Sequence, residues 1–155
     1  MVNYFSCSSH SNVLKALAKF YDARSCVAII IENAKGEILL LLRDDKPNIS
    51  FPNYWTLVGG KVENDETPEM AAHRELLEEI GVDIDLTFWK RYDRQHPKAI
   101  INQHIYLGKI DIPCESLTLG GGQDVRFFNF HEIKDLGIGF EFDILLLEYF
   151  LQSAA

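Results

Sequence analysis

Three glutamates lie within five positions near the middle of the chain: Glu75, Glu78 and Glu79. At about 100° per residue they share one face of a helix. Like charges at these spacings weaken an isolated helix by about 0.2–0.5 kcal/mol per pair. A dication that prefers oxygen ligands turns this repulsion into coordination. The pattern indicates a metal site, and its alternative is the solvated acidic surface that most glutamate clusters form.

The residues around the cluster carry start and stop signals for a helix. Thr67 is a good N-cap, and Pro68 suits the first helical position. Gly81 suits the left-handed position that follows a helix. We therefore expect a helix from Pro68 to Ile80. Arg74 lies one turn before Glu78, where it can orient a carboxylate.

A glycine pair, Gly59-Gly60, comes before the loop that leads to this helix, and glycine permits close backbone approach to a ligand. Gly60, Glu66 and the run RELLEEIGV from Arg74 to Val82 stand at fixed spacing. This spacing matches the Nudix box, and the chain resembles the Nudix hydrolases of the MutT type over about residues 24–150. The resemblance implies hydrolysis of a diphosphate linkage in a small nucleotide, a nucleoside diphosphate linked to a second group X, with Mg²⁺ (or Mn²⁺) as cofactor.

The resemblance also assigns roles to residues. Carried over by position, the metal ligands are Glu75, Glu78 and Glu79, with the Gly59 carbonyl as a candidate further ligand. Glu66 and Arg74 are the ion pair that fixes the loop against the helix. Lys61 follows the glycines and is expected near the phosphates.

The general base is left open by the sequence. Glu75 is the first choice, but some family members use a carboxylate outside the box. The matching loop here reads Gly120-Gly121-Gly122-Gln123-Asp124, so Gly121 stands where MutT-type proteins often have Glu. Asp124 or Glu115 could substitute, and the number of metals stays open. The alternative function is a catalytically weak or inactive Nudix-fold protein that binds or senses a nucleotide.

Signals for the substrate are weaker. Arg43 ends an expected strand, where it could reach a phosphate. Phe51 and Trp55 are candidates for stacking on a base, although aromatic residues of this kind are more often core. A nucleoside triphosphate, plain or modified, is the default substrate. A nucleotide sugar or ADP-ribose remains an alternative, the latter suggested only by Pro97.

The bulk properties narrow the class of protein. A chain of 155 residues is the size of one domain, and its net charge of −8 argues against a nucleic-acid polymer or an anionic membrane as partner. A small anionic ligand is compatible, because a cation can lie between acidic protein and phosphate. Three cysteines without metal-type spacing, short apolar runs and no evident signal peptide predict a cytoplasmic protein.

Runs of strands flanked by separated helices predict one α/β (α+β) domain, an α/β/α sandwich with a mixed β-sheet. We expect strands at 26–31, 37–43, 55–58, 84–93, 99–110 and 124–130, and a closing helix at 140–151. The segment 94–98 reads as a turn and 131–136 as one helical turn. An appended helix at about 12–22 could cover a sheet edge or serve a homodimer contact.

Overall fold

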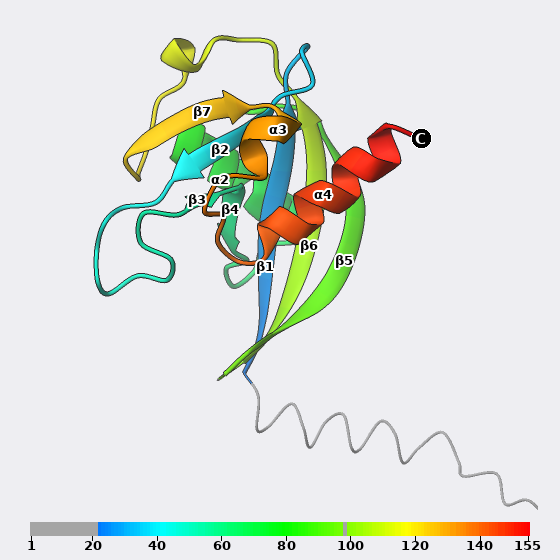
Figure 1. Ribbon diagram of the computed structural model, residues 1–155. Helices are drawn as coiled ribbons and strands as arrows, with labels where there is room; N and C mark the ends of the chain where they lie inside the picture. Colours follow the sequence, from blue (N-terminus) through cyan, green and yellow to red (C-terminus); the bar gives the residue numbers. More distant parts are fainter. Residues whose placement is uncertain (1–21, 98) are drawn as a thin grey trace, which may run out of the picture.

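The computed structural model describes residues 22–97 and 99–155 (Figure 1). The sheet has seven strands: β1 (Asp22–Glu32), β2 (Ile38–Leu42), β3 (Trp55–Thr56), β4 (Val58–Lys61), β5 (Leu86–His96), β6 (Ala99–Lys109) and β7 (Asp124–Phe128). The helices are α2 (Pro68–Ile80), α3 (Phe130–Ile133) and α4 (Phe142–Ser153), with a 3₁₀ turn, η1, at Cys114–Ser116.

Strand β1 is the centre of the sheet. It runs parallel to β6 along its whole length and antiparallel to β4 through Cys26–Lys61 and Ile29–Val58. The main strand order is β3-β2-β1-β6-β5, with β7 on β2 and β4 on β1. The sheet is therefore mixed, as the sequence predicted.

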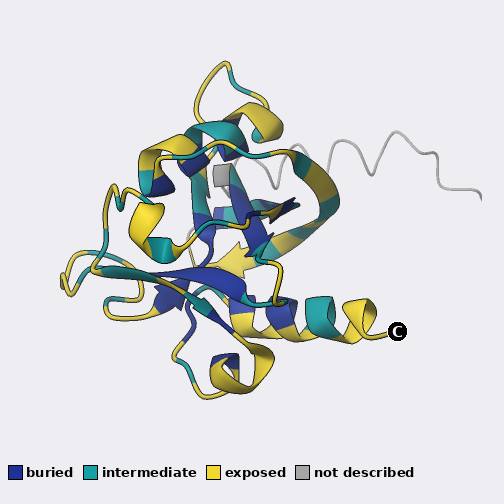
Figure 2. Cartoon of the chain, turned by 90° about the horizontal axis from the view of Figure 1, so that it is seen from above, coloured by how far each residue is buried: buried dark blue, intermediate teal, exposed yellow. Residues whose placement is uncertain are grey.

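The two faces of the sheet are covered by different helices (Figure 1). Alternate residues of β1 point to opposite faces. Ala28 and Ile30 pack in one cluster with residues of α3 and α4, whereas Val27, Ile29 and Ile31 pack with residues of α2. Figure 2 shows the buried residues gathered in the strands between helices with exposed outer surfaces. Burial on both faces explains why CVAIII is apolar throughout, and it confirms the α/β/α sandwich.

Helix α2 has the bounds that the sequence predicted. The Thr67 side chain accepts a hydrogen bond from the Met70 N–H, and Pro68 is the first helical residue. Gly81 has φ 73°, and its N–H donates to the carbonyls of Leu76 and Leu77. Glycine adopts this left-handed conformation without steric cost, which ends the helix.

Two expected elements differ from the structure, and a third lies almost wholly outside the described residues. The predicted turn at 94–98 was wrong in part, because β5 continues to His96 in antiparallel pairing with β6. The single strand expected at 55–58 is two strands, β3 on β2 and β4 on β1. The helix expected at 12–22 lies outside the described residues, except that Asp22 begins β1.

The orientation of α2 can be tested with two adjacent leucines. Leu76 is fully buried against the sheet, and Leu77 is 54% exposed. We expect Leu76→Ala to lower the free energy of unfolding by about 2–5 kcal/mol, because it leaves a cavity. Leu77→Ala should change it by less than about 1 kcal/mol. Urea denaturation of both variants measures the difference, and equal losses would contradict the packing described here.

Candidate active site

Helix α2 places its carboxylates against the glycines of β4. Gly60 lies so close to the Glu75 carboxylate that a Cβ at position 60 would collide with it. The Gly59 N–H donates to Oε2 of Glu79 at 3.0 Å. A Cβ at position 59 would collide with the backbone of β1. The glycine pair is therefore required for the helix and both strands to meet at these distances.

The Arg74 guanidinium joins the loop, the strand and the helix. It bonds both carboxylate oxygens of Glu66, with Nε at 3.1 Å and Nη2 at 2.7 Å. Nη2 also donates to the Lys61 carbonyl at 2.9 Å. Nη1 donates to Oε1 of Glu75 at 2.8 Å and to Oε2 of Glu78 at 3.0 Å. The planar fork of arginine suits such a bidentate arrangement.

Glu66, Glu75 and Glu79 have shifted pKa values. Burial raises the pKa of Glu79 to about 7, against the effect of the Gly59 N–H, which lowers it. Burial also raises the pKa of Glu75, and the Arg74 guanidinium partly offsets this. The hydrogen bonds from Arg74 lower the pKa of Glu66. Ionising Glu75 and Glu79 together is thus unfavourable unless a positive charge compensates.

The donors of this cluster fit a hard dication, although they are not arranged around one. Among residues 22–97 and 99–155, no three acidic, histidine or cysteine side chains converge closely enough to hold an ion as they stand. Nη1 of Arg74 supplies the positive charge between Glu75 and Glu78. Glu78 is exposed, and carboxylate oxygens are the ligands that Mg²⁺ and Mn²⁺ prefer.

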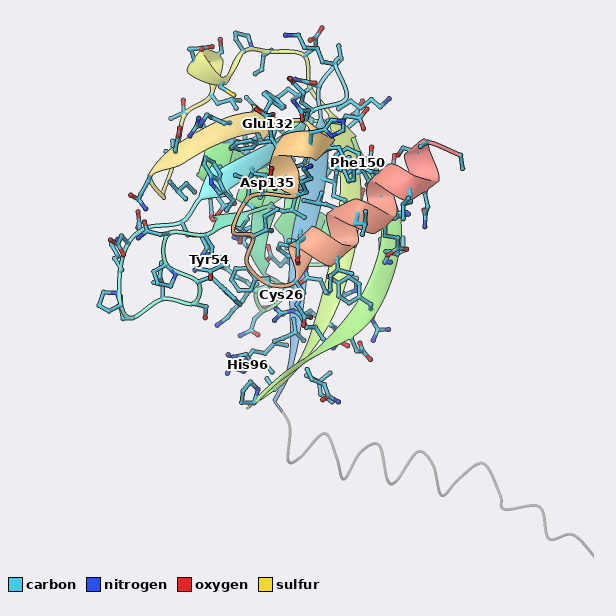
Figure 3. The ribbon with its side chains drawn as sticks, viewed as in Figure 1. Cys26, Tyr54, His96, Glu132, Asp135 and Phe150 are labelled. Atoms are coloured by element: carbon cyan, nitrogen blue, oxygen red, sulfur yellow. The ribbon has the colours of Figure 1, made fainter. Side chains whose placement is uncertain are left out.

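A cavity of about 500 Å³ opens beside the cluster, on the α4 face of the sheet. Gly59, Gly60 and Glu79 contribute to its lining, so it reaches the carboxylates. Cys26 and His96, labelled in Figure 3, line it further along β1 and β5. Its charged side chains, histidine aside, are four basic and two acidic: Arg24, Arg43, Lys61 and Arg94, with Glu79 and Glu141. In a chain of net charge −8, this cavity is suited to an anion.

Of the four predicted substrate-binding residues, three line the cavity and one does not. Arg43, Phe51 and Lys61 line the cavity. Trp55 does not belong there: it is only 8% exposed and its ring packs 4.7 Å from that of Phe128 in the core. The stacking role considered for Trp55 is therefore withdrawn, because its ring is already covered by Phe128 and by the Arg126 guanidinium, 5.3 Å from its centroid.

Sequence reasoning missed several residues of the cavity. Gln103 is 1% exposed on its floor, and Arg94 lies on the neighbouring strand. One signal for Gln103 was available. In the alternating strand 99–109 it takes an inward position between Ile101 and Ile105, where an apolar residue is the rule.

The glycine-rich loop after η1 packs against the end of α2. The Gly120 N–H donates to the Glu79 carbonyl at 2.9 Å, and a Cβ there would collide with the Glu78 carbonyl. At Gly121, by contrast, a Cβ would meet nothing within 4 Å. Gln123 donates to the Arg43 carbonyl at 2.7 Å and to Asn53 Oδ1 at 2.6 Å. The loop thus links α2 to the segment that carries Arg43.

Comparisons with known proteins agree with this geometry. A family model described as NUDIX domain matches residues 22–145. An uncharacterized Nudix hydrolase of Listeria innocua is 34% identical over 119 residues, which cover 75% of this chain and 69% of that protein. An 8-oxo-dGTP diphosphatase of Haemophilus influenzae is 40% identical over 83 residues, 50% of this chain and 57% of that protein. The crystal structure of a MutT protein from Methanosarcina mazei superposes with a TM-score of 0.74 at 20% identity, over 86% of this chain and 96% of that chain.

The raised pKa of Glu79 predicts a pH dependence of stability. In the unfolded chain a glutamate has a pKa of about 4.3, and in the fold that of Glu79 is about 7. Between these values the native state keeps a proton that unfolding releases, so this group destabilises the fold increasingly as pH rises through that window. In EDTA, Glu79→Gln should become more stable relative to the unmodified chain by on the order of 2 kcal/mol between pH 4.5 and 7.5.

Urea denaturation at several pH values measures this difference. Glu115→Gln is the control, because Glu115 is exposed and lies in η1. The free energy of unfolding of Glu115→Gln should change with pH in the same way as that of the unmodified chain. A constant difference between Glu79→Gln and the unmodified chain over this range would contradict the burial of an uncompensated carboxyl group.

Proposed function

The chain belongs to the Nudix family, whose members hydrolyse phosphorus-containing acid anhydrides, and we propose that it hydrolyses the diphosphate linkage of a small nucleotide with a divalent cation, Mg²⁺ or Mn²⁺. The observation that carries this proposal is the contact between the α2 carboxylates and the glycines of β4, at the end of a cavity whose charged side chains are mainly basic. A diphosphate can lie along these glycines while the attached groups occupy the cavity.

In this proposal Glu75, Glu78 and Glu79 hold the cation, with the Gly59 carbonyl as a further ligand. When bound, the cation neutralises phosphate oxygens and orients and acidifies the attacking water. Arg74 fixes the position of Glu75 through their 2.8 Å bond, and Glu66 fixes Arg74 from the loop.

Glu75 accepts the proton as water attacks phosphorus and the P–O bond of the bridging oxygen breaks. Burial raises the pKa of Glu75, which makes it a stronger base than an exposed carboxylate. Lys61 and Arg43 line the cavity, where they offset the charge that develops on the leaving group.

We propose a nucleoside triphosphate, plain or modified, as the substrate class. The similarity to an 8-oxo-dGTP diphosphatase supports this class of substrate. Because the similarity covers only half of this chain, we do not propose a particular nucleotide within the class. Net charge argues against a nucleic-acid polymer as substrate. Within the described residues, no helix has the length and hydropathy that a bilayer span requires.

The metal assignment predicts the effect of removing one carboxylate. We expect Glu78→Gln to lower kcat at least 100-fold, because a ligand to the catalytic ion is lost. Its stability should change little, since Glu78 is 58% exposed. Glu69→Gln is the matched control on the same helix and should retain activity. Phosphate release from a panel of nucleotides with Mg²⁺, Mn²⁺ or EDTA measures the effect, and full turnover by Glu78→Gln would show the assignment to be wrong.

The open space at Gly121 predicts a gain of function. Gly121→Glu should fold with unchanged stability, because its Cβ meets no neighbour. It adds a carboxylate next to Gly120, which packs on Glu78 and Glu79, and we expect kcat to rise several-fold. Gly120→Glu is the control that should destabilise, since its Cβ would collide with the Glu78 carbonyl.

The same panel of nucleotides distinguishes a hydrolase from a protein that only senses a nucleotide. If neither the unmodified chain nor Gly121→Glu turned over any nucleotide while both bound one, the domain would be a nucleotide sensor and the proposed hydrolysis would fail.

A further inference from the structure

Two buried hydrogen-bond donors on the cavity lining have no acceptor. Nε2 of Gln103 and Nε of Arg94 are both enclosed and unpaired within the described part of the chain. Gln103 as a whole is 1% exposed, and both residues line the cavity. Folded proteins rarely leave buried donors unpaired, and such atoms call for a ligand or an ordered water. We propose that Gln103 and Arg94 determine substrate specificity by binding oxo groups on the planar ring of the nucleotide.

The strand register brings the two donors together on one face. Gln103 in β6 is opposite Tyr92 in β5, and Arg94 is opposite Ile101. Residues two apart share a face, so Arg94 and Gln103 are diagonal neighbours with Cα atoms about 7–8 Å apart. Both can therefore reach different atoms of one ring.

The same register sets their distance from the diphosphate position. Gln103 is aligned with Cys26 in β1, which is aligned with Lys61 in β4. Two strand spacings separate Gln103 from the end of the glycine strand, about 10 Å. This separation leaves space for a sugar between the phosphates and the ring, an arrangement that rests on the proposed function.

Aromatic side chains near these donors favour a flat occupant. Two guanidinium groups approach the Phe140 ring, that of Arg43 at 5.1 Å and that of Arg94 at 5.5 Å from the ring centroid. Phe51 approaches it edge-on at 4.8 Å. Phe51, Phe140 and Glu141 have φ of 54°, 62° and 60°, a conformation that bulky residues rarely adopt. Strain of this kind is kept where the side chains must be held in position, and here it holds two rings at the cavity.

Because Gln103 Nε2 and Arg94 Nε are hydrogen-bond donors, they determine which substituent of the nucleotide base can bind next to them. Arginine has no acceptor, so Arg94 can only donate. A ring oxygen satisfies these donors, whereas an exocyclic amino group would face them with hydrogens. The cavity should therefore prefer hypoxanthine over adenine and uracil over cytosine, because each pair differs in an oxo group against an amino group. Sites with buried donors discriminate strongly, since the wrong ligand leaves those donors unpaired.

The test measures binding without hydrolysis. In EDTA, isothermal titration calorimetry compares IDP with ADP and UDP with CDP on the full chain. We expect the oxo member of each pair to bind at least 10-fold more tightly. Gln103→Leu should reduce this ratio to about 1 and raise Tm, because it removes an unpaired buried donor. Gln152→Leu, at an exposed position in α4, should keep the ratio.

Arg94→Met is the second variant, should Gln103→Leu fail to fold, and it should also reduce the ratio. Alkylation of Cys26, followed by peptide mass spectrometry with Cys114 as reference, should slow when IDP is bound, because Cys26 lies between Lys61 and Gln103 in the register. Equal binding of IDP and ADP, or an unchanged ratio in both variants, would overturn the inference. Turnover without such preference would leave the proposed function intact, and preference without turnover would refute the hydrolysis alone.

Discussion

One guanidinium group holds the site together. Arg74 is bonded to Glu66 in the loop, to the Lys61 carbonyl at the end of β4, and to Glu75 and Glu78 in its own helix. These bonds fix how far the loop stands from the helix and which way the carboxylates point. Without the guanidinium, carboxylates would repel one another across a partly buried space. This repulsion would cost more free energy than it does between exposed groups. Glu66, Glu75 and Glu78 are thus all held by this one group, whereas Glu79 is held by the Gly59 N–H.

The glycines of β4 make the second constraint, because they let a helix and a cavity meet at one strand. Glu75 occupies space that a side chain at position 60 would fill, and Glu79 bonds the Gly59 N–H while also lining the cavity. Helix α2 lies on one face of the sheet and the cavity on the other. At this short strand, groups on the two faces of the sheet come within reach of each other. The same closeness removes water from Glu75 and Glu79 and raises their pKa values.

The cavity depends on segments that are distant in sequence. Gln123 ties the segment of Arg43 and Asn53 to the loop after η1, and Phe51 meets Phe140 from the segment before α4. The floor comes from β1, β5 and β6, whose register aligns Cys26, Gln103 and Tyr92. These contacts join residues up to 89 positions apart, the separation of Phe51 and Phe140, and no local pattern encodes them.

The sequence alone determined the elements whose signals are local. The cap residues Thr67, Pro68 and Gly81 determined the bounds of α2, and the apolar run of β1 determined a strand buried on both faces. The spacing of Gly60, Glu66 and Arg74 determined the family, because one helix and one loop carry it. Only the tertiary structure decided that Trp55 is core, that β5 continues through Arg94, and that Nε2 of Gln103 is buried and unpaired beside the cavity. The physical reason is that burial, pairing and register are properties of strands meeting across the sheet, whereas caps and helical spacing are properties of neighbours in the chain.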